Sequence, residues 1–337
     1  MGLFNFLFRK KEKDKSNESR KGGDVIDAKF SEFGEWLEIS NIGFFGQFKK
    51  SGSGEWIVAW HDMHLTKKSD GGQEKKSGSY LLYNSKINKV IMWSQDIMRP
   101  QRGSISDTGI FLIEDWSDEH ISGRYELKSS VHVFSQDGKK LITRIFSANL
   151  FNSKISPNGK FAICQTCNSP SEDGNKLTLL DIENKKELFS IDSEIGWGED
   201  YKFDEGNREL IIEIKNVGWF RYGFDGKFLD YDKFSAGRLN SACYVEIILE
   251  AQNILSRDDV NDEAAREIIS SIDKAISIGA KENRSWYPQA LKAKGMAYEQ
   301  LGNINEALKY FEEALLVDTK IGLKRKITSL KKKINRE

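Results

Sequence analysis

The segment PQALKAKGMAYEQLGNINEALKYFEEALLVDTKI, residues 288–321, decides the fold of the C-terminal part of the chain. Its apolar and small residues recur every three or four positions on both sides of Gly302, which predicts two amphipathic helices joined by a tight turn. Gly295 and Ala307 are small enough to let the two helices approach closely. The ring of Phe311 would then fill the groove between them.

This 34-residue unit resembles a tetratricopeptide repeat. The residues at the signature positions of that family are Gly295, Tyr298, Gly302, Ala307, Phe311 and Ala314. Two positions depart from the family pattern, because Leu291 stands in place of the usual Trp and Thr319 in place of the usual Pro. The resemblance implies a stacked helix pair with a concave groove that binds extended peptides.

The resemblance also implies which side chains face that groove. They lie on the first helix of the pair and are Gln289, Lys292, Met296, Glu299 and Gln300. In this family a clamp for C-terminal carboxylates needs a Lys and an Asn at set places. Lys292 supplies the Lys, but Met296 stands where the Asn is required. We therefore expect a protein or peptide partner, but not capture of a chaperone tail.

Helical periodicity extends to both sides of this unit. Upstream, residues 241–255 predict the first helix of a degenerate repeat, and Ile268, Ile272, Ala275 and Ile278 follow the pattern of its second helix. Downstream, the spacing of Leu323, Ile327, Leu330 and Ile334 predicts a capping helix whose other faces are rich in Lys. A nucleic-acid or lipid contact is the alternative reading of those lysines, although a nucleic-acid partner is not the expectation.

From residue 35 to 232 the chain alternates short apolar runs with turns rich in Gly, Asn, Asp and Ser, which is typical of an all-β sandwich, barrel or propeller. Four segments repeat a turn followed by a strand, and they are residues 51–60, 106–113, 156–163 and 204–212. Their turn glycines are Gly54, Gly109, Gly159 and Gly206, at spacings of 55, 50 and 47 residues. A period near 50 residues predicts propeller blades of four strands each.

The SPNGK turn at residues 156–160 is similar to turns of WD40-like propellers, although the Gly-His and Trp-Asp dipeptides of that family are absent. The fold class predicted is therefore a small WD40-like β-propeller of about four blades followed by a short tetratricopeptide-like helical array. The last blade is expected to end with a strand at residues 227–229. An additional strand at residues 36–39 would close the ring or begin a fifth blade.

In a propeller, the loops between second and third strands emerge on one face. The two longest here are residues 62–78 and 115–129. The candidate binding residues on and beside them are Trp116, Asp115, His120, His61 and His64. Trp116 is either an aromatic anchor inside an acidic rim or a ring that packs beneath its own loop.

The chain has 51 basic and 51 acidic residues among 337, but the charge is unevenly distributed. Residues 1–21 carry a net charge of +4 and residues 320–337 a net charge of +7, so the remaining body is acidic at −11. The apolar start at residues 2–8 precedes basic residues, which is the reverse of a secretory signal. Residues 2–11 could anchor the protein reversibly to an anionic membrane, or the tail could simply be solvated.

Catalytic and metal-binding motifs are scarce. Cys164 and Cys167 have the spacing of a metal pair, but no second pair exists, and His61 and His64 are not in the arrangement of a zinc protease. No phosphate-binding loop, dinucleotide fingerprint or nucleophile elbow is present. We expect neither a cofactor nor a metal.

Three domains are expected: a basic, partly disordered tail at residues 1–24, the propeller at 25–235 and the helical array at 236–337. The sequence predicts a cytoplasmic, non-enzymatic adaptor or scaffold that binds partners through propeller loops and the helical groove. Peripheral membrane recruitment through residues 2–11 is one alternative. A hydrolase or lyase with its site in the propeller channel is the other.

Overall fold

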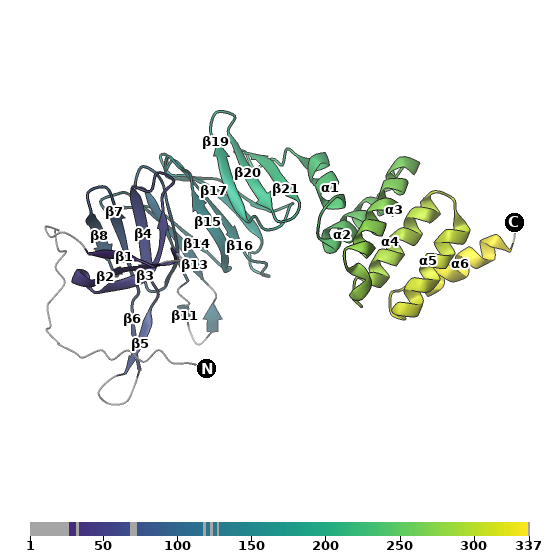
Figure 1. Ribbon diagram of the computed structural model, residues 1–337, viewed down its shortest axis with the longest axis horizontal. Helices are drawn as coiled ribbons and strands as arrows, with labels where there is room; N and C mark the ends of the chain where they lie inside the picture. The colour runs from purple at the N-terminus through teal and green to yellow at the C-terminus, as the bar shows by residue number, and fades with distance from the viewer. Residues whose placement is uncertain are drawn as a thin grey trace. The chain divides into compact units, whose positions relative to one another are not determined.

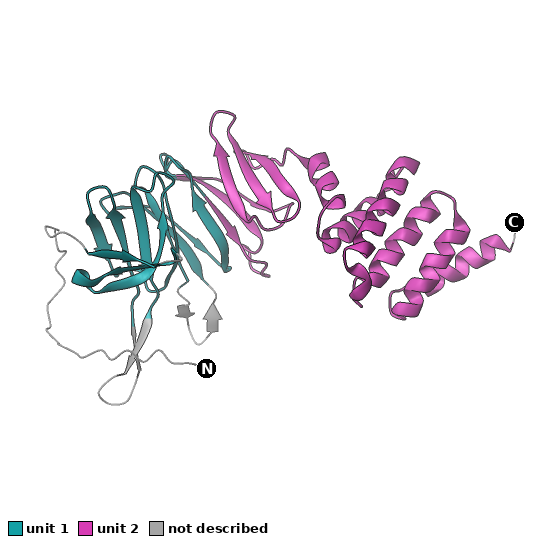
Figure 2. Cartoon of the chain, viewed as in Figure 1, with its two compact units in different colours: residues 1–162, 182–185 teal, residues 163–181, 186–337 magenta. Residues whose placement is uncertain are grey.

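The computed structural model describes residues 27–31, 34–67, 73–116, 119–121, 124–126 and 128–335, so the tail predicted at residues 1–24 lies outside the described residues. The chain divides into two compact units (Figure 2). The first comprises residues 1–162 with 182–185, and the second comprises residues 163–181 with 186–337. Antiparallel sheets come first along the chain, and helices follow them within the second unit (Figure 1). The domain boundary at residue 235 stays a prediction.

Two large antiparallel sheets lie wholly within the first unit. The first sheet has the order β1-β2-β3-β4-β7-β8, with β1 (Ala28–Phe30), β2 (Trp36–Ile39), β3 (Phe44–Lys50), β4 (Trp56–His61), β7 (Ser79–Asn84) and β8 (Lys89–Ser94). The second has the order β14-β13-β10-β9, with β9 (Pro100–Ile105), β10 (Phe111–Asp115), β13 (Ser129–Phe134) and β14 (Lys140–Phe146). The strand predicted at residues 36–39 is thus confirmed, and it widens the first sheet.

Smaller elements complete this unit. A short 3-10 helix, η1 (Ser40–Ile42), joins β2 to β3. Two hairpins are inserted between second and third blade strands: β5 (His64–Lys67) with β6 (Gln73–Lys76), and β11 (Glu119–Ile121) with β12 (Arg124–Glu126). These hairpins occupy the two long loops that the sequence analysis selected.

The next two sheets follow in chain order. One contains β15 (Leu150–Ile155), β16 (Phe161–Thr166), β17 (Lys176–Asp181) and β18 (Lys186–Asp192), and the other contains β19 (Asp200–Asp204), β20 (Glu209–Ile214) and β21 (Gly218–Gly223). Four successive antiparallel sheets of this kind confirm the predicted WD40-like fold class and its count of about four blades.

The fourth sheet lacks the outer strand predicted at residues 227–229, and that prediction is wrong. Only an isolated bridge between Tyr222 and Phe228 forms there. The run is cut short by Asp230, whose carboxylate accepts the backbone N–H of Arg221 at 3.0 Å. A side chain thus takes the hydrogen bond that a longer strand would have made, and the first helix begins at the next residue.

Each of the first three blades turns into its second strand through the same Ser-x-x-Gly turn. Gly54, Gly109 and Gly159 have φ of 74°, 76° and 75°, and their N–H groups bond the carbonyls of Ser51, Ser106 and Ser156 at 2.9–3.2 Å. Gly accepts this left-handed conformation without steric cost. In the fourth blade the predicted turn glycine, Gly206, lies in the turn before β20, but the left-handed residue of that turn is Arg208, with a φ of 54°.

Six α-helices occupy the described part of the second unit after the sheets. They are α1 (Tyr231–Leu239), α2 (Tyr244–Leu255), α3 (Asp262–Ser277), α4 (Tyr287–Gln300), α5 (Ile304–Val317) and α6 (Lys324–Ile334), with the 3-10 helix η2 (Ala280–Glu282) before α4. The predicted degenerate repeat is α2 with α3. Ile278 was expected in its second helix, but α3 ends one residue earlier and Ile278 is 40% exposed.

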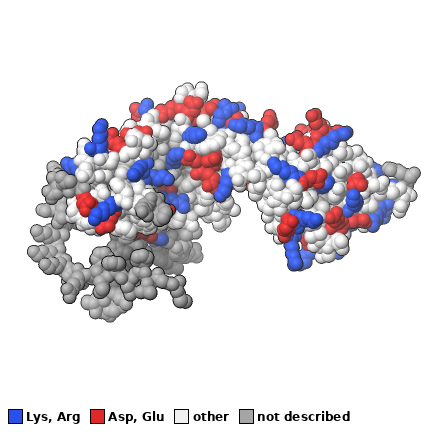
Figure 3. Space-filling view, viewed as in Figure 1, with Lys and Arg blue, Asp and Glu red and all other residues white. Residues whose placement is uncertain are grey.

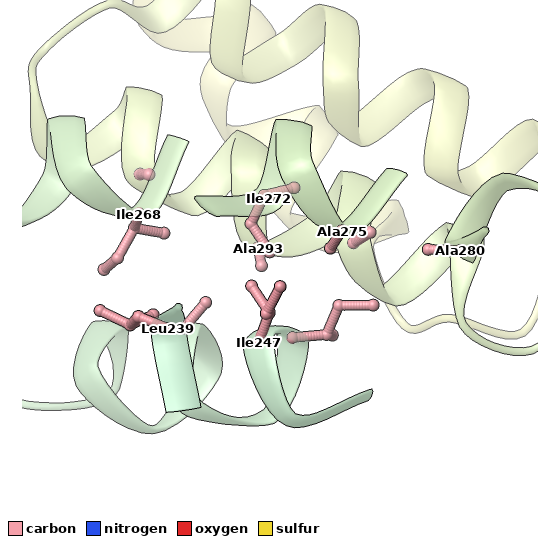
Figure 4. Packing of buried hydrophobic residues seen from close by; sticks show 11 residues of the cluster. Leu239, Ile247, Ile268, Ile272, Ala275, Ala280 and Ala293 are labelled. Atoms are coloured by element: carbon pink, nitrogen blue, oxygen red, sulfur yellow. The ribbon is translucent and has the colours of Figure 1, made fainter. Parts of the chain in front are cut away.

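One hydrophobic cluster joins the first four helices (Figure 4). Leu239 of α1, Ile247 of α2, Ile268 and Ile272 of α3 and Ala293 of α4 are all buried in it. The small side chain of Ala293 leaves room for the larger residues of α2 and α3 beside it. The degenerate repeat and the well-formed repeat therefore share one core.

A second cluster holds α4, α5 and α6 together. Leu291, Ala307, Phe311 and Ala314 contact the apolar stripe of α6, which confirms its predicted role as a capping helix. The stripe residues Leu323, Ile327 and Leu330 are at least nine-tenths buried. The α4–α5 approach is so close that a Cβ on Gly295 would lie 2.6 Å from the ring of Phe311.

Gly295→Ala should therefore destabilise the helical array despite raising helix propensity. Overpacking costs roughly 1–3 kcal/mol and propensity returns about 1 kcal/mol, so we expect a net loss of up to about 2 kcal/mol because the ring is fully buried. Urea unfolding followed by circular dichroism at 222 nm measures it. Asn305→Ala, at an exposed position of α5, is the control, and equal stability of both variants would contradict the packing argument.

Asp230→Ala tests the junction between the last sheet and α1. The change leaves the backbone N–H of Arg221 without its acceptor, which costs roughly 1–3 kcal/mol. We expect a lower melting temperature, whereas Asp225→Ala in the preceding turn serves as the exposed control. If Asp230→Ala melts at the same temperature as the wild-type protein, the bond between Asp230 and Arg221 does not stabilise the helical array.

Candidate interaction surfaces

The predicted groove residues lie on α4 as expected, but several of them already join helices to one another. Gln289 Oε1 accepts a hydrogen bond at 3.0 Å from Gln252 Nε2 on α2. Glu299 forms an ion pair at 2.6 Å with Lys326 on α6. This face of α4 is therefore fixed to its neighbours at both ends.

The other three predicted groove residues differ in their freedom. Met296 packs against the cluster that holds α5 and α6, and Gln300 Nε2 donates to the carbonyl of Val260 at 2.6 Å. Lys292 is half-buried and, within the described residues, enters no ion pair. The groove face thus presents one cation between two cross-links.

A second lysine of α4 is part of the core. Lys294 is 7% exposed, bonds Asp273 of α3 and lies 4.5 Å from the ring centroid of Tyr310. Burial alone would lower the pKa of Lys294. The bonds to Asp273 and Tyr310 outweigh this effect and raise the pKa above its ordinary value, so the ammonium stays charged. Sequence periodicity places this residue on the helix and gives no sign of its ion pair.

Around Trp116 the structure builds a connected polar cluster in the first unit. The indole Nε1 donates to Glu114 Oε2 at 3.2 Å, and the guanidinium of Arg102 lies 5.4 Å from the ring centroid. Trp116 is half-buried, and Asp115 Oδ1 accepts the backbone N–H of Arg99 at 3.0 Å. Trp116 is therefore held in place by its own and neighbouring strands.

Glu114 is not part of an acidic rim, because it is 1% exposed. Ser153 Oγ donates to its Oε1 at 2.7 Å. Burial raises the pKa of this carboxyl against the lowering effect of its hydrogen bonds and of Arg102. Sequence alternation predicts that a glutamate in a strand faces solvent. The sequence therefore gave no sign that Glu114 is buried.

The predicted histidines lie on three different elements. His61 ends β4 and is half-buried, whereas His64 begins β5 and His120 belongs to β11. The side chains of His64 and His120 lie outside the described residues. The structure therefore supplies no contact that unites the three imidazoles.

The fourth histidine, which sequence reasoning passed over, is buried beside Asp115. His132 hydrogen-bonds Ser130 and Thr143 at 3.0 Å each, and its Nε2 lies 4.0 Å from Asp115 Oδ2. Burial, helped by the charge of Lys140, lowers the pKa of His132 to about 4. The imidazole is therefore neutral at physiological pH.

The candidate metal residues do not converge. All three cysteines are thiols, with Cys164 buried and Cys167 and Cys243 half-buried. Within the described ranges no group of three or more His, Cys, Asp or Glu side chains is arranged to hold a metal ion.

Charged side chains are interspersed on the visible face of the described residues (Figure 3). A basic hollow lies on α6, where Lys324, Arg325 and Lys332 with Thr328 and Ser329 line about 380 Å³. The described part of the chain contains no helix long and apolar enough to cross a membrane. The apolar segment at residues 2–11 lies outside the described residues.

The comparisons with known proteins bear on the helical array most directly. The tetratricopeptide repeat family model matches residues 288–319, which confirms the resemblance of this segment. No curated protein matches the chain in sequence. The matched repeat is of a class that generally mediates protein interactions.

Two solved structures are similar to the chain at low identity. One is HIRA(644-1017), at 8% identity and a TM-score of 0.39, over 85% of this chain and 92% of that one. The other is the β-propeller domain of Cps50 (Swd1) from Myceliophteria_thermophila, at 10% identity and a TM-score of 0.28, over 52% of this chain and 65% of that one.

Acid should destabilise the first unit through His132. The folded pKa of about 4 lies below the ordinary value of 6.5, so the unfolded chain binds the proton more readily. The stabilisation is complete above pH 6.5 and is lost as the pH falls toward 4, a loss of roughly 3 kcal/mol. Chemical denaturation measured at pH 7, 6, 5 and 4 reports it.

His132→Gln is the matched comparison, because Gln retains hydrogen-bonding capacity without titrating. Glu114 acts in the opposite direction, since its raised pKa makes stability fall as the pH rises above 4.5. The difference between wild type and His132→Gln isolates the imidazole. If both lose stability equally on acidification, His132 is not the group responsible.

Proposed function

We propose that the protein is a non-enzymatic adaptor or scaffold that binds an extended segment of a partner protein along α4, beside α2 and α6. The observation that carries this proposal is the tetratricopeptide repeat at residues 288–319, whose inward face keeps a cation that enters no described ion pair. Repeats of this class present such a face to peptides.

The face is rigid before any partner arrives. The Gln252–Gln289 bond and the Glu299–Lys326 pair tie the two ends of α4 to its neighbours. Lys292 lies about 4.5 Å and about 10.5 Å along the helix from those two cross-links. A preorganised face loses less conformational entropy on binding, so a small number of contacts is enough to bind a partner.

Lys292 gives the proposed interface its polarity. The amine can reach a carboxylate or a backbone carbonyl of the partner, while its methylene stem covers the apolar surface beneath. A partner segment with an acidic residue or carbonyl opposite Lys292 is therefore favoured over a basic one.

A second proposed surface is centred on Trp116. Trp and Arg side chains are enriched at interface hot spots, and here the exposed Arg102 lies over the half-buried indole. The proposal includes a cytoplasmic location, which the thiol state of all three cysteines supports.

Lys292→Glu should reduce partner recovery at least about tenfold, which corresponds to about 1.4 kcal/mol of binding free energy. The measurement is a quantitative pull-down of the tagged full-length chain from native extract, read by mass spectrometry. Lys281→Glu, a charge reversal at an exposed residue of η2, is the matched control.

Trp116→Ala tests the second surface in the same experiment. A stoichiometric partner that is lost with Lys292→Glu but kept with Lys281→Glu assigns binding to the helical face. If both Lys292→Glu and Trp116→Ala recover the partner in the same amount as the wild-type protein, both surfaces are misassigned.

A further inference from the structure

The exposed side of α6 carries positive charge without any acidic side chain. Six of the 11 residues of this helix are Lys or Arg, and none is Asp or Glu. The apolar stripe of Leu323, Ile327 and Leu330 is buried in the cluster with α4 and α5, so all six cations lie on the exposed side. The capping role of the helix needs the stripe and not the charges, which therefore require an explanation of their own.

Two of the six cations are paired within the helical array. Lys326 Nζ lies 2.6 Å from Glu299 Oε1 on α4, and Lys331 Nζ lies 2.6 Å from Glu312 Oε1 on α5. The other four enter no ion pair with any residue that the structure describes, and they are Lys324, Arg325, Lys332 and Lys333. These four cations are therefore available to an anion from outside the array.

Three of the four available cations surround the basic hollow. Lys324, Arg325 and Lys332 line it together with Thr328 and Ser329. Residues four apart lie on the same side of a helix, so Lys324, Thr328 and Lys332 form one row about 12 Å long. All five lining residues are exposed, and no acidic or hydrophobic residue of the described part of the chain lines the hollow. A ligand at this place would meet cations and hydroxyl groups.

The cations at the start of α6 do not stabilise the helix itself. The first turn of a helix is the positive end of its dipole, where acidic side chains are favourable and basic ones are not. α6 begins with Lys324, Arg325 and Lys326, and it has neither an acidic residue in its first turn nor a side-chain cap at Leu323. The stability of the helix thus disfavours these residues, whereas an anionic partner would favour them.

The chemistry of the hollow distinguishes between classes of anionic partner. An acidic protein segment needs buried anchors, because exposed ion pairs alone contribute little to affinity. A single nucleic-acid strand is usually held by aromatic rings beside the cations, and the lining of the hollow includes no ring. An anionic lipid bilayer needs neither, since its headgroups present many charges in one plane and each nearby Lys or Arg adds to binding. The exposed side of α6 therefore fits a lipid surface best.

The sequence carries a second, separate feature that favours a membrane. Residues 2–8 are an apolar run, and Arg9, Lys10 and Lys11 follow it, which is typical of a segment that lies in a membrane interface. One weak signal gives marginal and reversible attachment, and two signals together give stable attachment. A membrane can accept an apolar run and a cationic helix at the same time.

We propose that the exposed cations of α6 bind the surface of an anionic lipid membrane. The contact is electrostatic and peripheral, because the apolar stripe of α6 is buried in the array and cannot enter the bilayer. Membrane binding through α6 is independent of peptide binding along α4, so the protein could present its peptide-binding face at a membrane surface.

Co-sedimentation of the full-length protein with lipid vesicles measures this binding. The anionic vesicles contain phosphatidylglycerol and phosphatidylcholine at a ratio of about one to two, and the control vesicles contain phosphatidylcholine alone. We expect binding to the anionic vesicles at about 0.1 M salt, where charges act over about 10 Å, and its loss at about 1 M salt, where that range falls to about 3 Å. The control vesicles should bind at least about tenfold less protein.

A variant without the three cations of the hollow assigns the binding to α6. Lys324→Gln/Arg325→Gln/Lys332→Gln should bind anionic vesicles roughly a hundredfold more weakly, since each cation near the surface contributes about fivefold. The melting temperature should not fall, because Gln is a good helix former and all three positions are exposed. The matched control removes the same charge at exposed positions outside the array and is Lys86→Gln/Lys186→Gln/Lys227→Gln.

Four results would overturn the proposal. They are equal binding by the α6 variant and the wild-type protein, an equal loss of binding in the control variant, binding that persists at about 1 M salt, and tighter binding of a labelled oligonucleotide, single-stranded or duplex, than of the anionic vesicles.

Two further variants separate this contact from other sites of the chain. If Phe4→Ser/Phe6→Ser/Phe8→Ser abolishes vesicle binding while the α6 variant binds normally, the membrane contact belongs to the N-terminal segment and not to α6. Lys292→Glu should leave vesicle binding unchanged, because this residue lies on the peptide-binding face of α4. Failure of the membrane contact is thus distinguishable from failure of the proposed peptide binding.

Discussion

The contact between Asp230 and Arg221 determines how the sheet part of the chain passes into its helical part. The carboxylate accepts the backbone N–H of Arg221 at 3.0 Å and also its guanidinium, at 3.0 Å from Nε and 2.6 Å from Nη2. The bond to Arg221 holds the pKa of Asp230 below its usual range, so the contact persists in mild acid. Asp230 thus bonds the last strand of the sheet at the residue immediately before α1.

The stability of the short array follows from that junction. An array of two repeats and a cap is below the three repeats usually needed for an independent solenoid. α1 compensates by covering α2, where Arg238 bonds both Glu246 and the 2% exposed Glu250 at 2.8 Å. A buried carboxylate is tolerated because its partner is charged and close. The cross-linked face of α4 is thus supported from both ends of the array.

Sequence reasoning identifies the elements whose local chemistry has one structural solution. A left-handed turn residue or a close helix approach restricts the choice to Gly, so Gly54, Gly159 and Gly295 could be read directly. The strand at residues 227–229 failed because the side chain of the next residue, Asp230, takes the backbone N–H of Arg221. Gly206 correctly located the fourth turn, but the sequence did not show that Arg208 is its left-handed residue.

Binding residues are harder to predict than folds, because partners within the chain compete for them. The repeat pattern places Gln289 and Glu299 on the groove face correctly, yet it does not reveal that Gln252 and Lys326 already bond them. The reverse holds in the first sheet. The alternation in β2 and β3 reads as ordinary half-buried strands, and only the pairing register shows that Trp36, Gln47 and Trp60 lie in one row on one face. Which side chains gather on one face of a sheet is therefore a property of register and not of composition.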